Sequence, residues 1–160
     1  MLNGANGLHV GHLNICSLGG KIPDLTVFLT EPCLFHIFGI TESRLKEHHN
    51  NNLLSIPNYS IIRRDAKRPL ETGVAAYIHD SVDEVTRRRQ DLECKEIECI
   101  WLEVKTTKAS PLLVGIVYRN PDSPFSWYDD FASMFDKIRN ISSDIVILGD
   151  FNINLFEARP

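Results

Sequence analysis

The sequence lacks several features that mark specialised classes of protein. No apolar run approaches the roughly 20 residues of a membrane-spanning helix, and the N-terminus shows no basic segment followed by an apolar one, as a secretory signal would. A basic excess, typical of nucleic-acid-binding domains, is also absent, because the net charge is −4. We therefore expect an intracellular protein with no membrane contact, in which any contact with a polyanion depends on local basic clusters or a metal ion.

Cysteine is scarce and irregularly spaced. The four cysteines lie at positions 16, 33, 94 and 99, without a Cys-x-x-Cys pair, so a zinc ribbon is not predicted. Cys16, Cys33 and Cys99 lie in or beside apolar runs, where a reduced cysteine packs as a small core residue. Histidine pairs at positions 9/12 and 48/49 have no cysteine or carboxylate at helical spacing, so they predict no zinc site either.

The composition is that of an ordinary globular chain. Apolar residues make up 43% and charged residues 24% of the sequence, which excludes a disordered or low-complexity segment. A length of 160 residues suits one domain, and we expect a single domain over residues 1–160.

Short apolar runs alternate with fewer helical patterns. Strands are predicted at residues 8–16, 35–40, 59–64, 73–79, 83–89, 96–105, 111–118 and 145–148. Helical spacing predicts helices at residues 21–34 and 123–140, the second with apolar residues at 125, 128, 131, 135 and 138. Segment 96–105 is apolar on both faces and belongs in the middle of a sheet. The pattern indicates an α/β fold in which helices flank a two-layered β core.

Polar side chains follow several of these strands where each one ends. Asp150 and Asn152 come after the buried strand 145–148, and Glu42 follows strand 35–40. Carboxylate and amide oxygens at the carboxyl ends of strands can hold a hard cation and orient water or phosphate. The same residues also suit ordinary roles, an Asx turn for Asp150 and a helix N-terminal acid for Glu42.

Two further sites add to this pattern. Asn14 interrupts the first apolar strand, where asparagine is disfavoured, so its side chain needs a partner. Tyr118 and Arg119 end the apolar strand 111–118. Four polar sites at or near strand ends are harder to explain as separate turns than any one of them alone.

Six motifs carry a family resemblance. In chain order they are Leu-Asn-Ile-Cys-Ser-Leu (13–18), Gly-Ile-Thr-Glu-Ser-Arg-Leu (39–45), Gly-Val-Ala-Ala-Tyr-Ile (73–78), Glu-Cys-Ile-Trp-Leu-Glu-Val (98–104), Ile-Val-Tyr-Arg-Asn-Pro-Asp-Ser (116–123) and Ile-Leu-Gly-Asp-Phe-Asn-Ile-Asn (147–154). This order resembles the endonuclease/exonuclease/phosphatase superfamily, and most closely the apurinic-like endonuclease domain of non-LTR retrotransposons.

The resemblance implies a four-layered α/β sandwich of the DNase-I-like type that hydrolyses phosphodiester bonds with Mg²⁺, or with Mn²⁺ as an alternative. Matched by motif, Asn14 and Glu42 would hold the metal. Asp150 would position the attacking water, while Asn152 and Tyr118 would contact the scissile phosphate. A bound metal would also let an acidic protein bind a polyanion.

The implied partner is DNA, contacted through its phosphate backbone. Arg119, Ser17 and the basic pair Arg63 and Arg64 are the expected contacts, although a solvated strand end is an equally ordinary role for that pair. In the retrotransposon branch the domain nicks target DNA so that a downstream reverse transcriptase can prime on the 3′-hydroxyl, which implies a nuclear location.

The sequence also departs from the family pattern. A late Asp and a Ser-Asp-His motif, which follow further strands in the family, do not occur in it. We therefore expect a domain whose C-terminal strands are missing, with marginal stability and negligible nuclease activity. Two alternatives stay open, namely another superfamily branch (phosphatase, phospholipase or RNA exonuclease) and a non-catalytic nucleic-acid-binding remnant.

Overall fold

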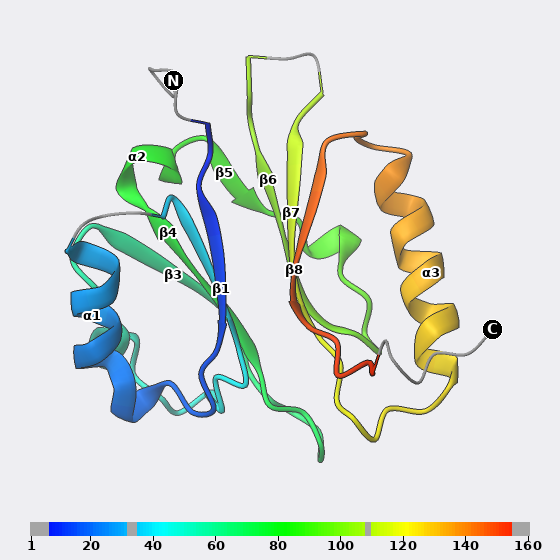
Figure 1. The fold of residues 1–160 in the computed structure, drawn as a ribbon, viewed down its shortest axis with the longest axis horizontal. Helices are drawn as coiled ribbons and strands as arrows, with labels where there is room; N and C mark the ends of the chain where they lie inside the picture. Colours follow the sequence, from blue (N-terminus) through cyan, green and yellow to red (C-terminus); the bar gives the residue numbers. More distant parts are fainter. Residues whose placement is uncertain (1–6, 32–34, 108–109, 155–160) are drawn as a thin grey trace.

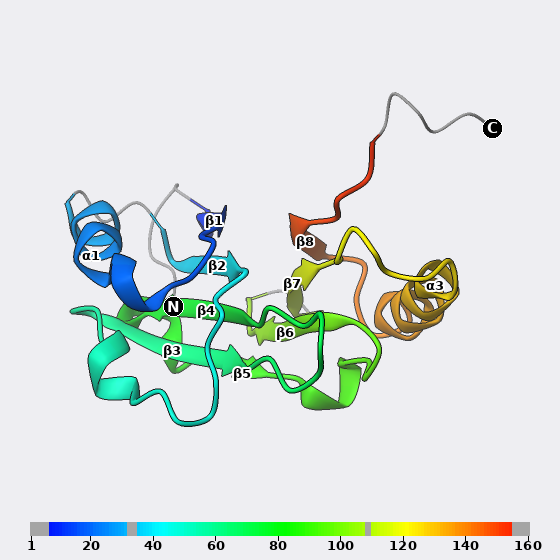
Figure 2. The same cartoon turned by 90° about the horizontal axis from the view of Figure 1, so that it is seen from below.

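Two four-stranded sheets lie face to face, and a helix covers the outer face of each sheet (Figure 1). The computed structural model describes residues 7–31, 35–107 and 110–154. Viewed from below, the two sheets and their helices form four successive layers (Figure 2). This is the predicted four-layered α/β sandwich.

The first sheet has the strand order β1-β2-β4-β3. Its strands are β1 (Val10–Asn14), β2 (Ile37–Thr41), β3 (Tyr59–Arg64) and β4 (Val74–His79). Strands β1 and β2 are parallel, because α1 (Ile22–Thr30) carries the chain back across the sheet between them, while β4 is antiparallel to both of its neighbours.

The second sheet repeats this plan, with the order β5-β6-β7-β8. Its strands are β5 (Thr86–Arg88), β6 (Glu98–Val104), β7 (Leu112–Tyr118) and β8 (Ile145–Asp150). Here β7 and β8 are the parallel pair, joined across α3 (Ser126–Arg139). The short connecting helices are η1 (Gly19–Lys21), η2 (Asn51–Leu54), α2 (Asp80–Asp83) and η3 (Gln90–Leu92).

Three apolar layers hold the four structural layers together. One lies between α1 and the first sheet, one between the sheets, and one between the second sheet and α3. Strand β6 supplies two of them by simple alternation, since Cys99 and Trp101 face α3 whereas Ile100, Leu102 and Val104 face the other sheet. Both faces of β6 are therefore buried, which confirms its predicted place inside a sheet.

Several boundaries differ from those predicted. Strand β1 ends at Asn14, so this residue terminates the strand and does not interrupt it. Helix α1 ends at Thr30, and residues 32–34 of the predicted helix lie outside the described residues. Residues 80–83, partly assigned to a strand, form α2. Helix α3 starts at Ser126, and its buried side chains are Trp127, Met134 and Ile138.

Two expectations about burial were wrong. Phe125, predicted on the apolar face of a helix, precedes α3 and is 81% exposed. Cys16, predicted as a small core residue, is exposed because it lies in the turn after β1, whereas Cys99 is buried as expected. Cys16, Cys94 and Cys99 are free thiols, and Cys33 lies outside the described residues.

The two parallel pairs decide where polar side chains gather. Strands β1, β2, β7 and β8 all end at the lower side of the molecule in Figure 1. In such sheets ligands bind at the carboxyl ends of the strands. Within the described ranges, the structure contains no helix long and apolar enough to cross a membrane.

Candidate active site

Three strand ends meet through the side chain of Asn14. Its Nδ2 donates to Glu42 Oε1 at 2.9 Å and to Asp150 Oδ2 at 2.8 Å, which joins residues at the ends of β1, β2 and β8. The Tyr118 hydroxyl, at the end of β7, donates to the same Glu42 oxygen at 3.3 Å. Four of the predicted site residues therefore lie in one hydrogen-bonded cluster, while their catalytic roles stay predictions.

The turns that carry this cluster have unusual backbone conformations. Positive φ angles occur at residues around the site, namely Cys16 (47°), Ser17 (87°), Glu42 (51°), Arg44 (53°) and Asn152 (48°). A left-handed conformation in a non-glycine residue costs about 1–3 kcal/mol and is frequent at functional sites. Contacts between the turns hold it in place, since Ser17 N donates to Glu42 O at 2.8 Å.

An open cavity of about 740 Å³ adjoins the cluster between β1 and β8. It is lined by His12, Asn14, Gly149, Asp150, Phe151, Asn152 and Ile153. The cavity thus places the Asn14 and Asp150 side chains beside a space that a substrate group can enter.

Asn152 lines the same cavity and contacts the cluster through its backbone. Its backbone N donates to Asp150 Oδ1 at 3.1 Å, which is the Asx turn considered above, and its Nδ2 donates to Arg119 O at 2.8 Å. Asn152 follows the end of β8 in a left-handed conformation, so strand alternation no longer sets its direction. One Asp150 oxygen thus serves the turn, while the other faces Asn14.

Burial shifts the pKa of two groups at the site. Burial raises the pKa of the Tyr118 phenol to about 12, and the charge of Glu42 adds to the effect. The phenol is therefore neutral at pH 7 and serves as a hydrogen-bond donor. Burial lowers the pKa of His12, against the opposing effect of the Asp150 charge. His12 also lies within hydrogen-bond distance of Thr41 Oγ1, at 3.0 Å.

The basic pair predicted to contact DNA has partners within the protein. Arg63 donates to His49 O at 2.9 Å and pairs with Asp65 at 3.2 Å. Arg64 reaches across to the second sheet and donates to Cys94 O at 3.0 Å and Lys95 O at 3.1 Å. Through these contacts the two guanidinium groups hold loops together, and the predicted DNA contact stays a prediction.

The other two predicted DNA contacts differ from each other in exposure. Arg119 is only 8% exposed, and its guanidinium lies against the rings of Trp127 and Tyr128. It donates to Asn152 O at 3.3 Å, so it holds the loop after β8. Ser17 is half-buried in the turn next to Glu42. DNA binding by either residue stays a prediction.

The sequence analysis overlooked two residues beside the site. Arg44 is exposed, and its Nη2 lies 3.7 Å from Glu42 Oε2, which makes it a cation available to a phosphate. His12 lines the cavity next to Asp150. A signal for His12 was present, because residues two apart on a strand share a face and Asn14 was already a candidate. Arg44 gave no such signal, since its place depends on the left-handed turn.

The donor set suits a hard cation. Glu42 and Asp150 direct carboxylate oxygens toward the same amide group of Asn14. Rotation of that amide would present a third oxygen to the same point, and Mg²⁺ or Mn²⁺ prefers oxygen ligands with one or two carboxylates. Across the described residues, no group of three or more His, Cys, Asp and Glu side chains could hold a metal. The fit therefore depends on two carboxylates and an amide.

The solved structures that are similar to this chain include nucleases and phosphatases. The endonuclease domain of TRAS1, a telomere-specific non-LTR retrotransposon, has a TM-score of 0.66 and 14% identity over 94% of this chain and 61% of that one. The 3′ phosphatase NExo from Neisseria, bound to a product DNA hairpin, has a TM-score of 0.68 and 17% identity, with 92% and 58% covered. A mannosyl-6-phosphatase of Bacteroides thetaiotaomicron has a TM-score of 0.64 and 13% identity over 95% of this chain and 68% of that one.

These likenesses show the fold of the endonuclease/exonuclease/phosphatase superfamily, a DNase I-like α/β sandwich. The chain spans 61% and 58% of the lengths of the TRAS1 and NExo structures. No protein-family model matches the sequence, and a search of curated proteins finds no match.

Proposed function

We propose that the cluster of Asn14, Glu42, Tyr118 and Asp150 is the metal- and phosphate-binding part of a phosphodiester hydrolase site that acts on DNA. The observation that carries the proposal is the meeting of two carboxylates on one amide at the ends of three strands, beside an open cavity. The fold supports it, because the similar structures include nucleases and a phosphatase.

Each residue has a distinct task in this proposal. Glu42 and Asn14 would hold a divalent cation, which supplies charge neutralisation at a phosphate oxygen when bound. Asp150 would accept a hydrogen bond from the attacking water and align it with the phosphorus atom. Tyr118, neutral at pH 7, would donate a hydrogen bond to a phosphate oxygen.

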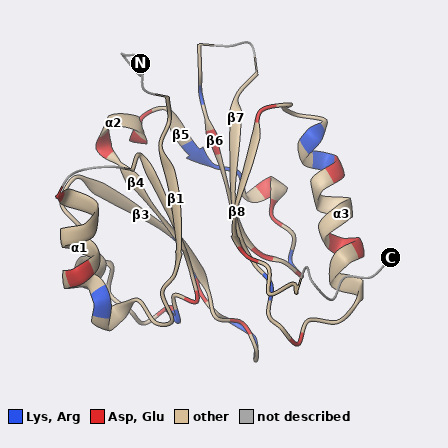
Figure 3. Cartoon of the chain, in the orientation of Figure 1, with Lys and Arg blue, Asp and Glu red and all other residues tan. Residues whose placement is uncertain are grey.

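The charge distribution makes the cation important for binding DNA. Lys and Arg are scattered over several elements among Asp and Glu (Figure 3), and the net charge is −4. Close to the cluster, Arg44 supplies an exposed positive charge. A polyanion would therefore depend on the bound cation and on few basic side chains.

We further propose that the chain comes from the retrotransposon branch, with a reverse transcriptase encoded downstream and a nuclear location. Support comes from the sequence motifs and from a likeness to the TRAS1 domain that extends over 94% of the chain. Reading the coding sequence after codon 160 tests this. A continuing frame with a reverse transcriptase supports the proposal, and a frame encoding an unrelated domain contradicts it.

Metal binding tests the site itself. Titration of the purified chain with Mn²⁺, followed by electron paramagnetic resonance, should show one bound ion. Replacing Glu42 by Gln should weaken binding at least about tenfold, because the variant loses the carboxylate that the proposal assigns to the cation. Glu47→Gln, on the exposed segment after β2 and outside the cluster, is the matched control. Absence of Mn²⁺ binding, or equal loss in the control, contradicts the proposed site.

A further inference from the structure

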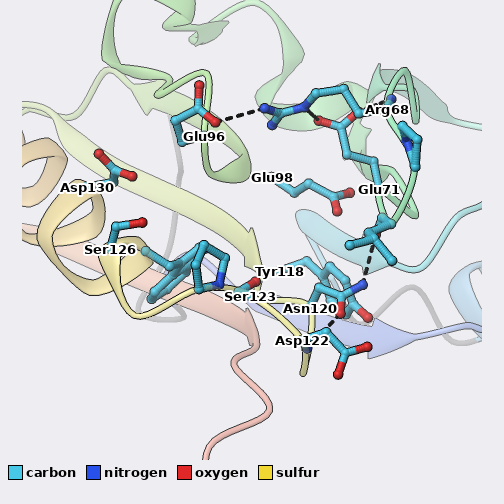
Figure 4. Close-up of a pocket in the computed structure, with 14 residues that line it drawn as sticks. Arg68, Glu71, Glu96, Glu98, Tyr118, Asn120, Asp122, Ser123, Ser126 and Asp130 are labelled. Atoms are coloured by element: carbon cyan, nitrogen blue, oxygen red, sulfur yellow. Dashed lines mark hydrogen bonds and ion pairs between the residues drawn. The ribbon is translucent and has the colours of Figure 1, made fainter.

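Glu98 is a buried carboxylate that the proposed reaction does not use. It is 9% exposed, begins β6, and lies opposite Tyr118 in the β6–β7 pairing. Figure 4 shows it extending from its strand toward the segment that carries Glu71. An ionised side chain in such a place needs hydrogen-bond donors to offset the loss of water.

Those donors are backbone amides of the segment before β4. Glu98 Oε2 accepts hydrogen bonds from Gly73 N at 2.7 Å and from Thr72 N at 3.0 Å, and Oε1 lies 3.2 Å from Thr72 N. Hydrogen bonds to a charged acceptor are stronger than those between neutral groups. The carboxylate thus holds one specific peptide segment.

The same segment holds the turn that carries Glu42. Ser43 N donates to Gly73 O at 3.0 Å, and Arg44 N donates to Thr72 O at 2.6 Å. Gly73 has a φ of 80°, and a Cβ there would lie 2.7 Å from Ser43 Oγ, so only glycine allows this approach. Thr72 and Gly73 therefore connect the Glu98 carboxylate to the left-handed turn at Glu42 and Arg44 through backbone hydrogen bonds.

We propose that Glu98 is a positioning residue, which fixes the Glu42 carboxylate by holding Thr72 and Gly73 against the turn after β2. Its importance for metal binding rests on the proposed function, whereas its effect on the turn does not. The carboxylate acts on Glu42 through two backbone segments, so its removal should loosen the turn that carries Glu42.

Two conservative variants test the proposal. Glu98→Asp keeps the charge but withdraws the carboxylate by one methylene, whereas Glu98→Gln keeps an acceptor oxygen at full reach. Amide hydrogen exchange, measured by NMR at Ser43 and Arg44, should be about tenfold faster in Glu98→Asp, as expected when hydrogen bonds to a charged acceptor are weakened. Glu98→Gln should restore part of the protection, because it keeps an acceptor oxygen at full reach without the charge. Unchanged exchange at Ser43 and Arg44 in Glu98→Asp would overturn the proposal.

Mn²⁺ affinity separates positioning from general stabilisation. Glu98→Asp should bind Mn²⁺ about tenfold more weakly, in the range seen for groups that orient metal ligands. Glu103→Gln is the control, since Glu103 is also buried on β6 but pairs with Arg87 and Arg89. Equal loss of affinity in this control would overturn positioning. If the unaltered chain binds no Mn²⁺, the proposed function fails, and the exchange data still decide the positioning inference.

Discussion

Tyr118 links the chemistry of the site to its burial at the scale of a single residue. The side chain is 4% exposed, and its hydroxyl donates to Glu42. Burial, followed by the charge of Glu42, raises the phenol pKa from 10.0 to about 12. Ionisation beside an existing carboxylate is unfavourable, so the residue keeps its proton over the whole physiological range.

Alkaline titration of tyrosinate absorbance checks this shift. The difference between the unaltered chain and Tyr118→Phe should titrate near pH 12. The folded pKa lies above the unfolded value, so the phenol's contribution to stability is complete below pH 10 and is lost as the pH rises toward 12. Tyr118→Phe should therefore reduce the fall in melting temperature over that interval. If the absorbance lost in Tyr118→Phe titrates near pH 10, the raised pKa of the Tyr118 phenol is contradicted.

Arg119, a predicted DNA contact, packs against two aromatic rings of the segment after β7. Its guanidinium carbon lies 5.8 Å from the Trp127 ring centre and 5.2 Å from that of Tyr128. Arg119→Lys should lower the free energy of unfolding by about 1–2 kcal/mol, because an ammonium group neither stacks nor forks in the same way.

Urea denaturation measures this difference. Arg139→Lys is the control, because Arg139 pairs with Asp136 while both side chains are more than 60% exposed, and its loss should cost less than about 0.5 kcal/mol. Equal effects of the two substitutions would show that the ring contacts of Arg119 contribute nothing.

At the scale of elements, the close approach of β7 and β8 positions a site residue. Gly149 precedes Asp150 on β8 and pairs with Val117 on β7. A Cβ at position 149 would overlap the Val117 carbonyl oxygen. The absence of a side chain therefore lets β8 approach β7 closely enough to hold Asp150 beside Asn14.

Gly149→Ala should consequently disturb both the strand pair and the site. We expect a loss of about 1–3 kcal/mol, the usual range for overpacking, together with weaker Mn²⁺ binding. Gly20→Ala is the control, since a Cβ at that position meets nothing within 4 Å. Chemical denaturation and the Mn²⁺ titration provide the readouts, and equal stability of the two variants would contradict the close-approach argument.

Strand β8 also bears on the stability of the whole molecule. It ends the second sheet, yet residues 145–148 are all apolar and only partly buried. An edge strand of this kind leaves backbone groups and apolar surface without cover among the described residues. At about 25 cal/mol per Å², a few hundred Å² of such surface forfeits several kcal/mol, comparable with the net stability of a domain.

Thermal melting of the purified chain tests this deficit. We expect a transition well below about 60 °C, or aggregation, since mesophilic domains melt at about 45–65 °C. Circular dichroism at several protein concentrations separates melting from association. A cooperative transition above about 60 °C would show that the chain closes its own core.

The catalytic rate also depends on the complete set of catalytic side chains. A positioned acid or base contributes about 10²–10⁴ in rate. The late Asp and the Ser-Asp-His motif that the resemblance implies do not occur in the sequence. Within the described residues the site cavity contains one imidazole, that of His12. We therefore expect plasmid nicking with Mg²⁺ to stay at background. Robust nicking that is lost in Asp150→Ala would contradict this, and loss in His12→Ala would then identify the missing group.

Sequence patterns predicted helices on both sides of a β core, and the motif resemblance predicted the residues of the cluster. Period-two alternation placed β6 inside a sheet, because side-chain direction along a strand is a local property. The apolar run of β8 was predicted to be buried, but it lies on an edge strand and is only partly buried. Glu42 and Asp150 follow apolar strands, and ligands bind at the carboxyl ends of such strands, which predicted that these residues share a site. Helix boundaries and the exposure of Phe125 were less well predicted, since caps and packing partners decide them.

The partners of each polar group within the protein came from the three-dimensional structure. Sequence could not show that Arg63 and Arg64 bond to distant backbone carbonyls or that Arg119 packs on aromatic rings, because a guanidinium is satisfied equally well by such groups or by a phosphate. It could not show Arg44 beside Glu42 or Glu98 against Thr72 and Gly73. The first contact depends on the left-handed backbone of a single turn, and the second joins segments that are far apart in the chain.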